Sequence, residues 1–131
     1  MTESLLSSTT RSLQELQTQV VYLYFQLSDR VLDYTQWYPA IAICRSMMIY
    51  VGVKVGGIGS KEDFRTLAAI YSVLETYQTV LKNGDTLPNF DFLRIVRKTN
   101  SLCQKYEDLR REEWEEQHLQ EQSSKTELQQ P

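Results

Sequence analysis

Histidine is almost absent from this sequence, which contains a single one, His118, among 131 residues. Serine and cysteine nucleophiles generally need a neighbouring histidine base, and His118 lies in an acidic segment near the end of the chain. Glu115 and His118 do form a Glu-x-x-His pair, but a di-iron bundle needs two such pairs and two further carboxylates. The sequence therefore predicts a protein that is not an enzyme and that has no metal or other cofactor.

A second carboxylate pair gives no stronger evidence of catalysis. Asp29 and Asp33 lie about one helical turn apart, with Arg30 beside them and no companion ligand nearby in the sequence. Acid–base catalysis needs a group positioned within hydrogen-bonding reach of a substrate proton. We interpret this pair as surface charge, and no small-molecule substrate is indicated.

Cysteine is also scarce. Cys44 and Cys103 are far apart and each lies within an apolar helical pattern, which favours two buried free thiols over a disulfide. Free thiols are typical of a reducing compartment, and residues 1–10 lack the basic and continuous apolar regions of a signal peptide. The predicted localisation is therefore cytoplasmic.

Long uninterrupted apolar runs are missing as well. The most apolar stretch, residues 40–59, contains Arg45 and Lys54, and burying either charge near the middle of a bilayer is costly. We predict a buried core segment and no association with a membrane.

Glycine is concentrated in one segment, residues 51–64, VGVKVGGIGSKEDF, which holds four of the five glycines. In a phosphate-binding loop, glycine and lysine precede the serine or threonine, whereas here Ser60 precedes Lys61. The glycines do not follow the G-x-G-x-x-G spacing of dinucleotide-binding proteins either. We predict a turn into a helix capped by Ser60 and Asp63; the alternative is the weak anion affinity common to helix N-termini.

Apolar residues recur at alternating spacings of three and four along most of the chain, as they do in helices with one buried side. The predicted helices span residues 3–36, 39–52, 61–83 and 90–116. The fold class is therefore all-α, a compact bundle of about four helices in one domain, residues 1–116. Residues 117–131 offer almost nothing to bury, so a disordered, flexible polar tail is predicted there.

The second and third predicted helices carry two further expectations. The second is apolar on nearly all sides, which places it at the centre of the bundle. Its end is left open, because residues 51–55 also alternate as a short extended segment would. Gly84 is expected to end the third helix in a left-handed conformation.

Charge is spread unevenly along the chain. Residues 1–60 carry four basic and four acidic side chains, residues 61–105 seven and five, and residues 106–131 three and eight, which gives net charges of 0, +2 and −5. Within the last predicted helix, Arg94, Lys98 and Lys105 fall within roughly 40° of one another and Arg97 lies about 60° away. These four residues, the basic band, are candidate phosphate-binding residues; the alternative is an ordinary solvated helix face.

Aromatic residues make up 11% of the chain. Tyr34, Trp37 and Tyr38 crowd the end of the first predicted helix and are candidate partner-binding residues, because tyrosine and tryptophan often anchor interfaces. The alternative is that they pack in the core at a helix junction.

Taken together, these patterns predict a non-enzymatic helical interaction protein, either a homo-oligomer or a small subunit or adaptor of a larger cytoplasmic assembly. The alternative function is that of a small helical subunit of a nucleoprotein complex, which would contact the nucleic-acid backbone through the basic band.

Overall fold

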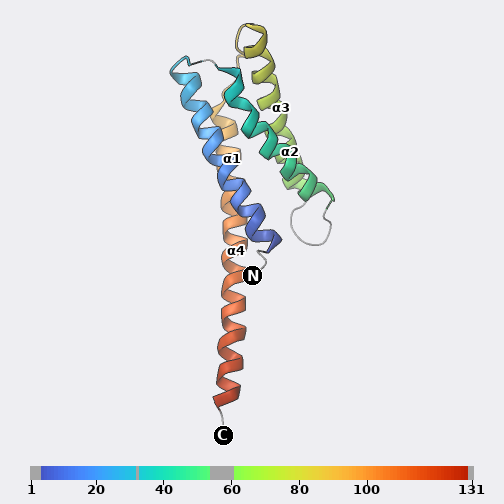
Figure 1. Ribbon diagram of the computed structural model, residues 1–131, viewed down its shortest axis with the longest axis vertical. Helices are drawn as coiled ribbons and strands as arrows, with labels where there is room; N and C mark the ends of the chain where they lie inside the picture. Colours follow the sequence, from blue (N-terminus) through green and yellow to red (C-terminus); the bar gives the residue numbers. More distant parts are fainter. Residues whose placement is uncertain (1–3, 32, 54–60, 130–131) are drawn as a thin grey trace.

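Four α-helices and one short 3-10 helix form the fold in a computed structural model, which describes residues 4–31, 33–53 and 61–129 (Figure 1). The elements are α1 (Leu5–Ser28), η1 (Tyr34–Trp37), α2 (Tyr38–Val53), α3 (Lys61–Asn83) and α4 (Leu93–Gln129). The described residues include no strand. The predicted all-α class with about four helices is confirmed.

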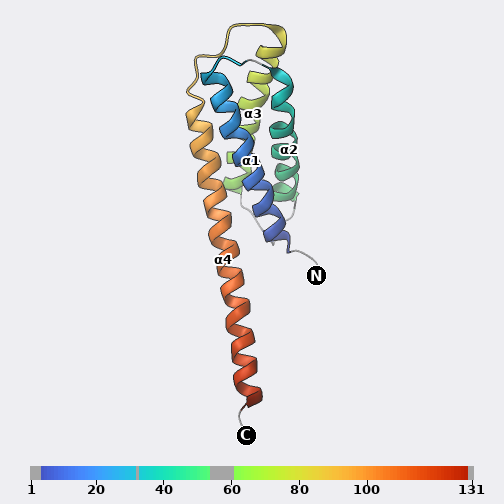
Figure 2. The same ribbon diagram turned by 60° about the vertical axis from the view of Figure 1, so that its left-hand side comes forward.

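The helices form a bundle whose contacts are uneven. α1 packs most extensively against α4, and α2 packs most extensively against α3. α3 and α4 close the bundle through a much smaller shared surface. α4 continues well beyond the ends of the other helices (Figure 2), and we call residues 112–129 the stalk.

The core runs along the inner sides of all four helices. It contains apolar side chains from each of them: Leu13, Leu16, Val20, Leu23, Ala40, Cys44, Met47, Leu67, Ile70, Leu74, Ile95, Leu102 and Tyr106, among others. These residues recur at spacings of three and four, with the buried Thr99 completing the pattern between Ile95 and Leu102, so each helix turns one side inward.

An aromatic cluster closes the end of the bundle where η1 meets α3 and α4. The Trp37 and Tyr77 rings stack with centroids 5.4 Å apart, and Phe92 meets Trp37 edge-on at 5.5 Å. The Tyr77 hydroxyl donates a hydrogen bond to the carbonyl of Phe90 at 3.1 Å. Because buried aromatic pairs add to the energy of area burial, this cluster holds the bend after α1 against the rest of the fold.

α1 ends eight residues before the predicted end at 36, and the reason is a left-handed residue. Arg30 has φ 62°, the Val31 N–H donates to the Gln26 carbonyl at 2.9 Å, and the Arg30 N–H donates to the Leu27 carbonyl at 3.3 Å. These bonds form a Schellman motif, which satisfies the last carbonyls of the helix. Asp33 then caps η1 by accepting from the Thr35 N–H at 3.0 Å.

The other helix ends are set by equally local interactions. α1 begins after Ser4, whose hydroxyl accepts from the Ser7 N–H at 3.0 Å. Gly84 has φ 70° directly after α3, which confirms the predicted stop. α2 is helical through Val53, so residues 51–53 belong to a helix. Residues 54–60 of the glycine-rich segment, with the predicted Ser60 cap, lie outside the described residues, and residues 61–64 begin α3.

Two expectations about the helices differ from the structure. α2 is not surrounded by partners, because one of its sides is exposed along its length. α4 does not end at 116 but continues to Gln129; its last turns are polar, and polar helix formers such as glutamate and glutamine prolong a helix that is already nucleated by packing. The expected flexibility of residues 117–131 stays a prediction.

We expect Arg30→Gly to stabilise the protein by about 1 kcal/mol, because glycine adopts the left-handed conformation without the steric cost that a Cβ brings. Urea unfolding followed by circular dichroism measures the change. As the matched control, Gly84→Ala places a Cβ at an equivalent left-handed position where nothing lies within 4 Å, and it should destabilise by a similar amount. Equal midpoints for all three proteins would contradict this account of the helix ends.

Candidate docking surfaces

The three aromatic residues predicted to bind a partner lie in different environments. Trp37 is only 1% exposed, and its ring is enclosed by the aromatic cluster. It therefore belongs to the core, because the chain folds back at η1 and buries it against α3 and α4. Tyr38 is 47% exposed, and Tyr34 is half-buried with its ring edge-on to Tyr38 at 6.4 Å. Of the three, Tyr38 is the residue that an incoming protein would meet.

Tyr38 begins a longer exposed surface along α2. Tyr38, Ala42, Ser46 and Ile49 follow one another at spacings of four, four and three and are all exposed, with Tyr50 beside them. Ile49 is 60% exposed and Tyr50 is 47% exposed. We call these five residues the outer face of α2. Most of its area is apolar or aromatic, which is unusual for the solvent side of a helix.

Among the described residues of α2, the charged one is Arg45, and its charge is already compensated. The Arg45 guanidinium donates to the Tyr71 hydroxyl at 3.0 Å, and that hydroxyl donates to the Glu75 carboxylate at 2.7 Å. Arg45 also lies over the Tyr71 ring and 3.9 Å from the Glu75 carboxylate. The sequence contained a signal for the outer face of α2, because a helix that is apolar on nearly all sides is covered either by its own fold or by another chain.

The basic band is partly engaged inside the protein. Arg94, Arg97 and Lys98 are exposed on α4, and the Arg94 guanidinium lies over the Phe90 ring, 5.9 Å from its centroid. Lys105 instead reaches α3, where its ammonium group lies 2.7 Å from the Asp63 carboxylate. The four residues thus share one side of α4, as predicted, but the band contains three outward cations and one paired cation.

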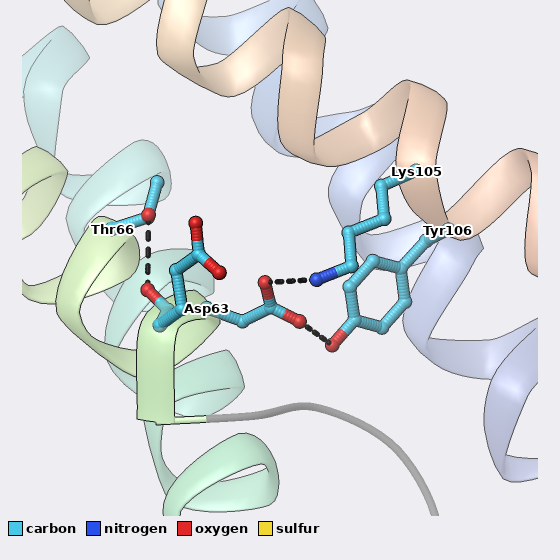
Figure 3. A network of polar contacts seen from close by, with 5 residues as sticks. Asp63, Thr66, Lys105 and Tyr106 are labelled. Carbon is cyan, nitrogen blue, oxygen red and sulfur yellow. Dashed lines mark hydrogen bonds and ion pairs between the residues drawn. The ribbon is translucent and has the colours of Figure 1, made fainter.

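Asp63 is the centre of a buried polar network that the sequence did not reveal. Its side chain extends from the first turn of α3 toward α4 (Figure 3), is 4% exposed, and accepts from Lys105 at 2.7 Å and from the Tyr106 hydroxyl at 2.9 Å. Burial of the phenol, together with the hydrogen bond to Asp63, raises the pKa of Tyr106 above its ordinary value. The helix N-terminus adds favourable partial positive charge near this carboxylate.

A groove lies beside this network, where α3 and α4 pack least. Its volume is about 320 Å³, and its walls include Glu62 and Thr66 of α3 and Arg97, Lys98, Ser101 and Lys105 of α4. We call it the α3–α4 groove. Because Asp63 and Lys105 compensate each other, Arg97 and Lys98 dominate its charge, with Glu62 opposing them.

The remaining candidate residues have structural roles or lie in solvent. His118 stacks on Trp114 on the exposed stalk, with ring centroids 3.7 Å apart. Asp33 caps η1, and its hydrogen bonds with Thr35 lower the pKa of its carboxyl. Within residues 4–31, 33–53 and 61–129, no three histidine, cysteine or acidic side chains gather as a metal site requires.

Both cysteines are free and buried. The Cys44 thiol donates to the Leu67 carbonyl at 3.2 Å. Burial raises the pKa of Cys44 to about 12, and burial, followed by the nearby charge of Glu107, raises the pKa of Cys103 to about 12. Neither thiol forms the thiolate that a nucleophile needs near neutral pH.

No helix in the described part of the chain combines the length and hydropathy that crossing a membrane requires. Comparisons of the chain with protein-family models, with curated proteins and with solved structures give no match. Function is therefore inferred from the surfaces described above.

We expect Asp63→Ala to destabilise the protein by about 2–4 kcal/mol, because it leaves the buried Tyr106 hydroxyl without its acceptor and removes the partner of Lys105. Tyr106→Phe should cost only about 1 kcal/mol, since Lys105 still pairs with Asp63. Urea unfolding measures both. Asp85→Ala, in the exposed loop after α3, is the control and should change stability by less than about 0.5 kcal/mol; a loss at Asp63 no larger than this would refute the network's importance.

Stability should fall as the pH rises from about 9 toward 12. The unfolded chain releases the thiol protons near the ordinary pKa of 9.0, whereas the folded protein keeps them until about 12, so alkaline pH favours unfolding. Each thiol contributes up to about 1.4 kcal/mol per pH unit in this window. Urea midpoints between pH 7 and pH 11 test this, and Cys44→Ala should make the decline shallower; an unchanged slope would exclude Cys44 as a cause.

Proposed function

We propose that this protein acts by association rather than catalysis, as a non-enzymatic helical interaction protein whose outer face of α2 binds a partner protein. The observation that carries the proposal is that this face is both apolar and exposed along the length of α2. Covering it would remove apolar area from water without stranding an unpaired charge, because Arg45 keeps its own partners within the chain.

The chemistry of the outer face of α2 resembles the centre of a protein interface. Interface centres are depleted in charged residues and enriched in tyrosine and other aromatic residues. Tyr38 and Tyr50 supply rigid aromatic rings with a polar hydroxyl, and Ile49 supplies aliphatic area. Such side chains contribute much contact area at low conformational cost, which is why aromatic residues often dominate binding energy.

The shape of the outer face of α2 favours a helical partner. Its middle consists of the small side chains Ala42 and Ser46, and larger side chains, Tyr38 and Ile49, stand at its ends. Small residues let two helix backbones approach closely, and the flanking large residues fill the grooves on either side of the contact. We expect the partner to present an apolar helix of low charge, bound by helix-to-helix packing.

Two observations argue against catalysis by the residues most suited to it. The thiols of Cys44 and Cys103 are buried and protonated. The imidazole of His118 stacks on Trp114 on the stalk, away from either thiol. A free, buried pair of thiols also fits the cytoplasm, where we propose that the protein works.

Nucleic-acid contact through the basic band is the weaker alternative. Lys105 is paired with Asp63, which leaves three outward cations, Arg94, Arg97 and Lys98. Because affinity for the phosphate backbone grows with the number of phosphates neutralised, three cations make a weak site on a single chain.

The test uses two versions of the full chain, each expressed in the cells that naturally produce the protein. One version carries a photo-crosslinking amino acid in place of Ile49, and the control carries the same amino acid in place of the exposed Thr79 of α3. We expect irradiation to give one discrete adduct from position 49 and none from position 79. Adding Ser46→Arg, which inserts a charged side chain into the middle of the face, should remove the adduct without changing helicity in circular dichroism.

Each outcome of this experiment is informative. An adduct of twice the 15.3 kDa chain mass would make the partner a second copy, and another mass would make it a different protein; either supports docking on the outer face of α2. Absence of an adduct, or an adduct that persists with Ser46→Arg, would overturn the proposal.

A further inference from the structure

One side of α4 changes the sign of its charge midway along the helix. The residues on this side follow one another at spacings of three and four: Arg94, Lys98, Ser101, Lys105, Asp108, Glu112, Glu116 and Leu119. At about 100° per residue they stay within roughly 40° of a common direction. All are exposed except Asp108, which is half-buried. We call this the α4 stripe, basic in its first half and acidic in its second.

The two halves of the α4 stripe have different surroundings. The basic half borders the α3–α4 groove, whose walls include Arg97, Lys98 and Lys105. The acidic half begins at the half-buried Asp108 and continues onto the stalk, where α4 extends beyond the ends of the other described helices (Figures 1 and 2). Most helical stability in proteins comes from tertiary packing, so a surface that covers the stalk would stabilise it.

We propose that two copies of this chain pair through their α4 helices in antiparallel orientation, with the stalk of each copy lying along the α3–α4 groove of the other. The basic half of each α4 stripe then faces the acidic half of its partner. The relation is two-fold, so every contact between one residue and another occurs twice.

The spacing of the charges supports this register. When position 105 of one copy lies opposite position 108 of the other, Lys98 faces Glu115 and Arg97 faces Glu116, because positions advance along one helix as they recede along the other. Arg94 then faces Leu119, which is 66% exposed, and Leu119 approaches the Phe90 ring over which Arg94 lies. Opposite charges thus meet where Lys98 faces Glu115 and where Arg97 faces Glu116, and Arg94 meets an apolar side chain.

The same charges exclude the parallel orientation. In a parallel pair, Lys98 would face Lys98 and Glu116 would face Glu116, and like charges placed opposite one another repel.

The middle of the α4 stripe also offers a place for contact: a shallow depression of about 690 Å³ borders Ser101, Lys105, Asp108 and Leu109. In the antiparallel arrangement this depression lies near the two-fold axis, where Leu109 of each copy faces Gln104 of the other.

This contact is independent of the outer face of α2, which lies on another helix. A pair formed through α4 would display two such faces, so the dimer would bind partner proteins in duplicate. The two proposals are tested separately, because Ser46→Arg changes α2 and leaves every residue of the α4 contact in place.

The experiment measures the mass of the full, nuclease-treated chain by light scattering during size-exclusion chromatography at about 50 mM and about 500 mM salt. We expect twice the 15.3 kDa chain mass at low salt, and a dissociation constant at least about tenfold higher at high salt, because exposed ion pairs are screened. A monomer at low salt would overturn the proposal.

Charge reversal tests the register. The pair of changes Arg97→Glu and Lys98→Glu should raise the dissociation constant at least about tenfold, and so should Glu115→Lys with Glu116→Lys, because each places like charges opposite one another. Mixing the two variants in equal amounts should restore a dimer, since each supplies the charges that the other needs. Positions 98 and 115 are roughly 25 Å apart within one helix, so the rescue cannot arise inside one chain. Lys82→Glu on α3 is the control and should leave the mass unchanged.

The remaining outcomes would overturn the proposal. Reversal that leaves the dimer intact, or a mixture that stays monomeric, would exclude this register. If nuclease treatment reduces a larger particle to a monomer and the released material absorbs at 260 nm, the basic half binds a nucleic-acid backbone instead of a second stalk.

Discussion

The buried carboxylate of Asp63 is the constraint on which the arrangement of α3 and α4 depends. These two helices share little surface, so apolar packing alone holds them less firmly than it holds α1 to α4. Asp63 accepts hydrogen bonds from Lys105 and Tyr106, two consecutive residues of α4, and a shift of α3 by one turn would break both bonds. Leaving the buried Asp63 carboxylate without these partners would strongly destabilise the fold. The network therefore fixes the register of α3 against α4.

The same network determines which positive charges the surface of α4 presents. By holding Lys105 against α3, it removes one cation from the basic band and leaves the α3–α4 groove beside it. The groove is positive because Arg97 and Lys98 remain outside the network. The polar contact thus joins the two helices, and the groove lies beside it.

The distribution of apolar area explains why association is the proposed function. A small domain cannot bury all of its apolar surface, and here part of the excess lies on the outer face of α2, where Tyr38, Ile49 and Tyr50 are exposed on one helix, while the rest is divided among the other elements. The charges along α4 are segregated by sign, because the α4 stripe is basic in its first half and acidic in its second, toward the stalk. The outer face of α2 thus favours a partner of low charge. The α4 stripe favours a helix that is acidic in one half and basic in the other, which a second copy of the chain supplies.

The sequence by itself determined the class of fold, most of the core and several helix ends, because these depend on local spacing. Leu13, Leu16, Val20 and Leu23 fall on one side of any helix that contains them, and glycine at position 84 accepts a left-handed conformation whatever surrounds it. The basic band was visible for the same reason. Tertiary structure alone decided that Trp37 is buried, that α2 keeps one side exposed and that Lys105 pairs with Asp63. These outcomes depend on which helices become neighbours, and residues 42 and 43 positions apart, such as Asp63 with Lys105 and Tyr106, meet only when the whole bundle has closed.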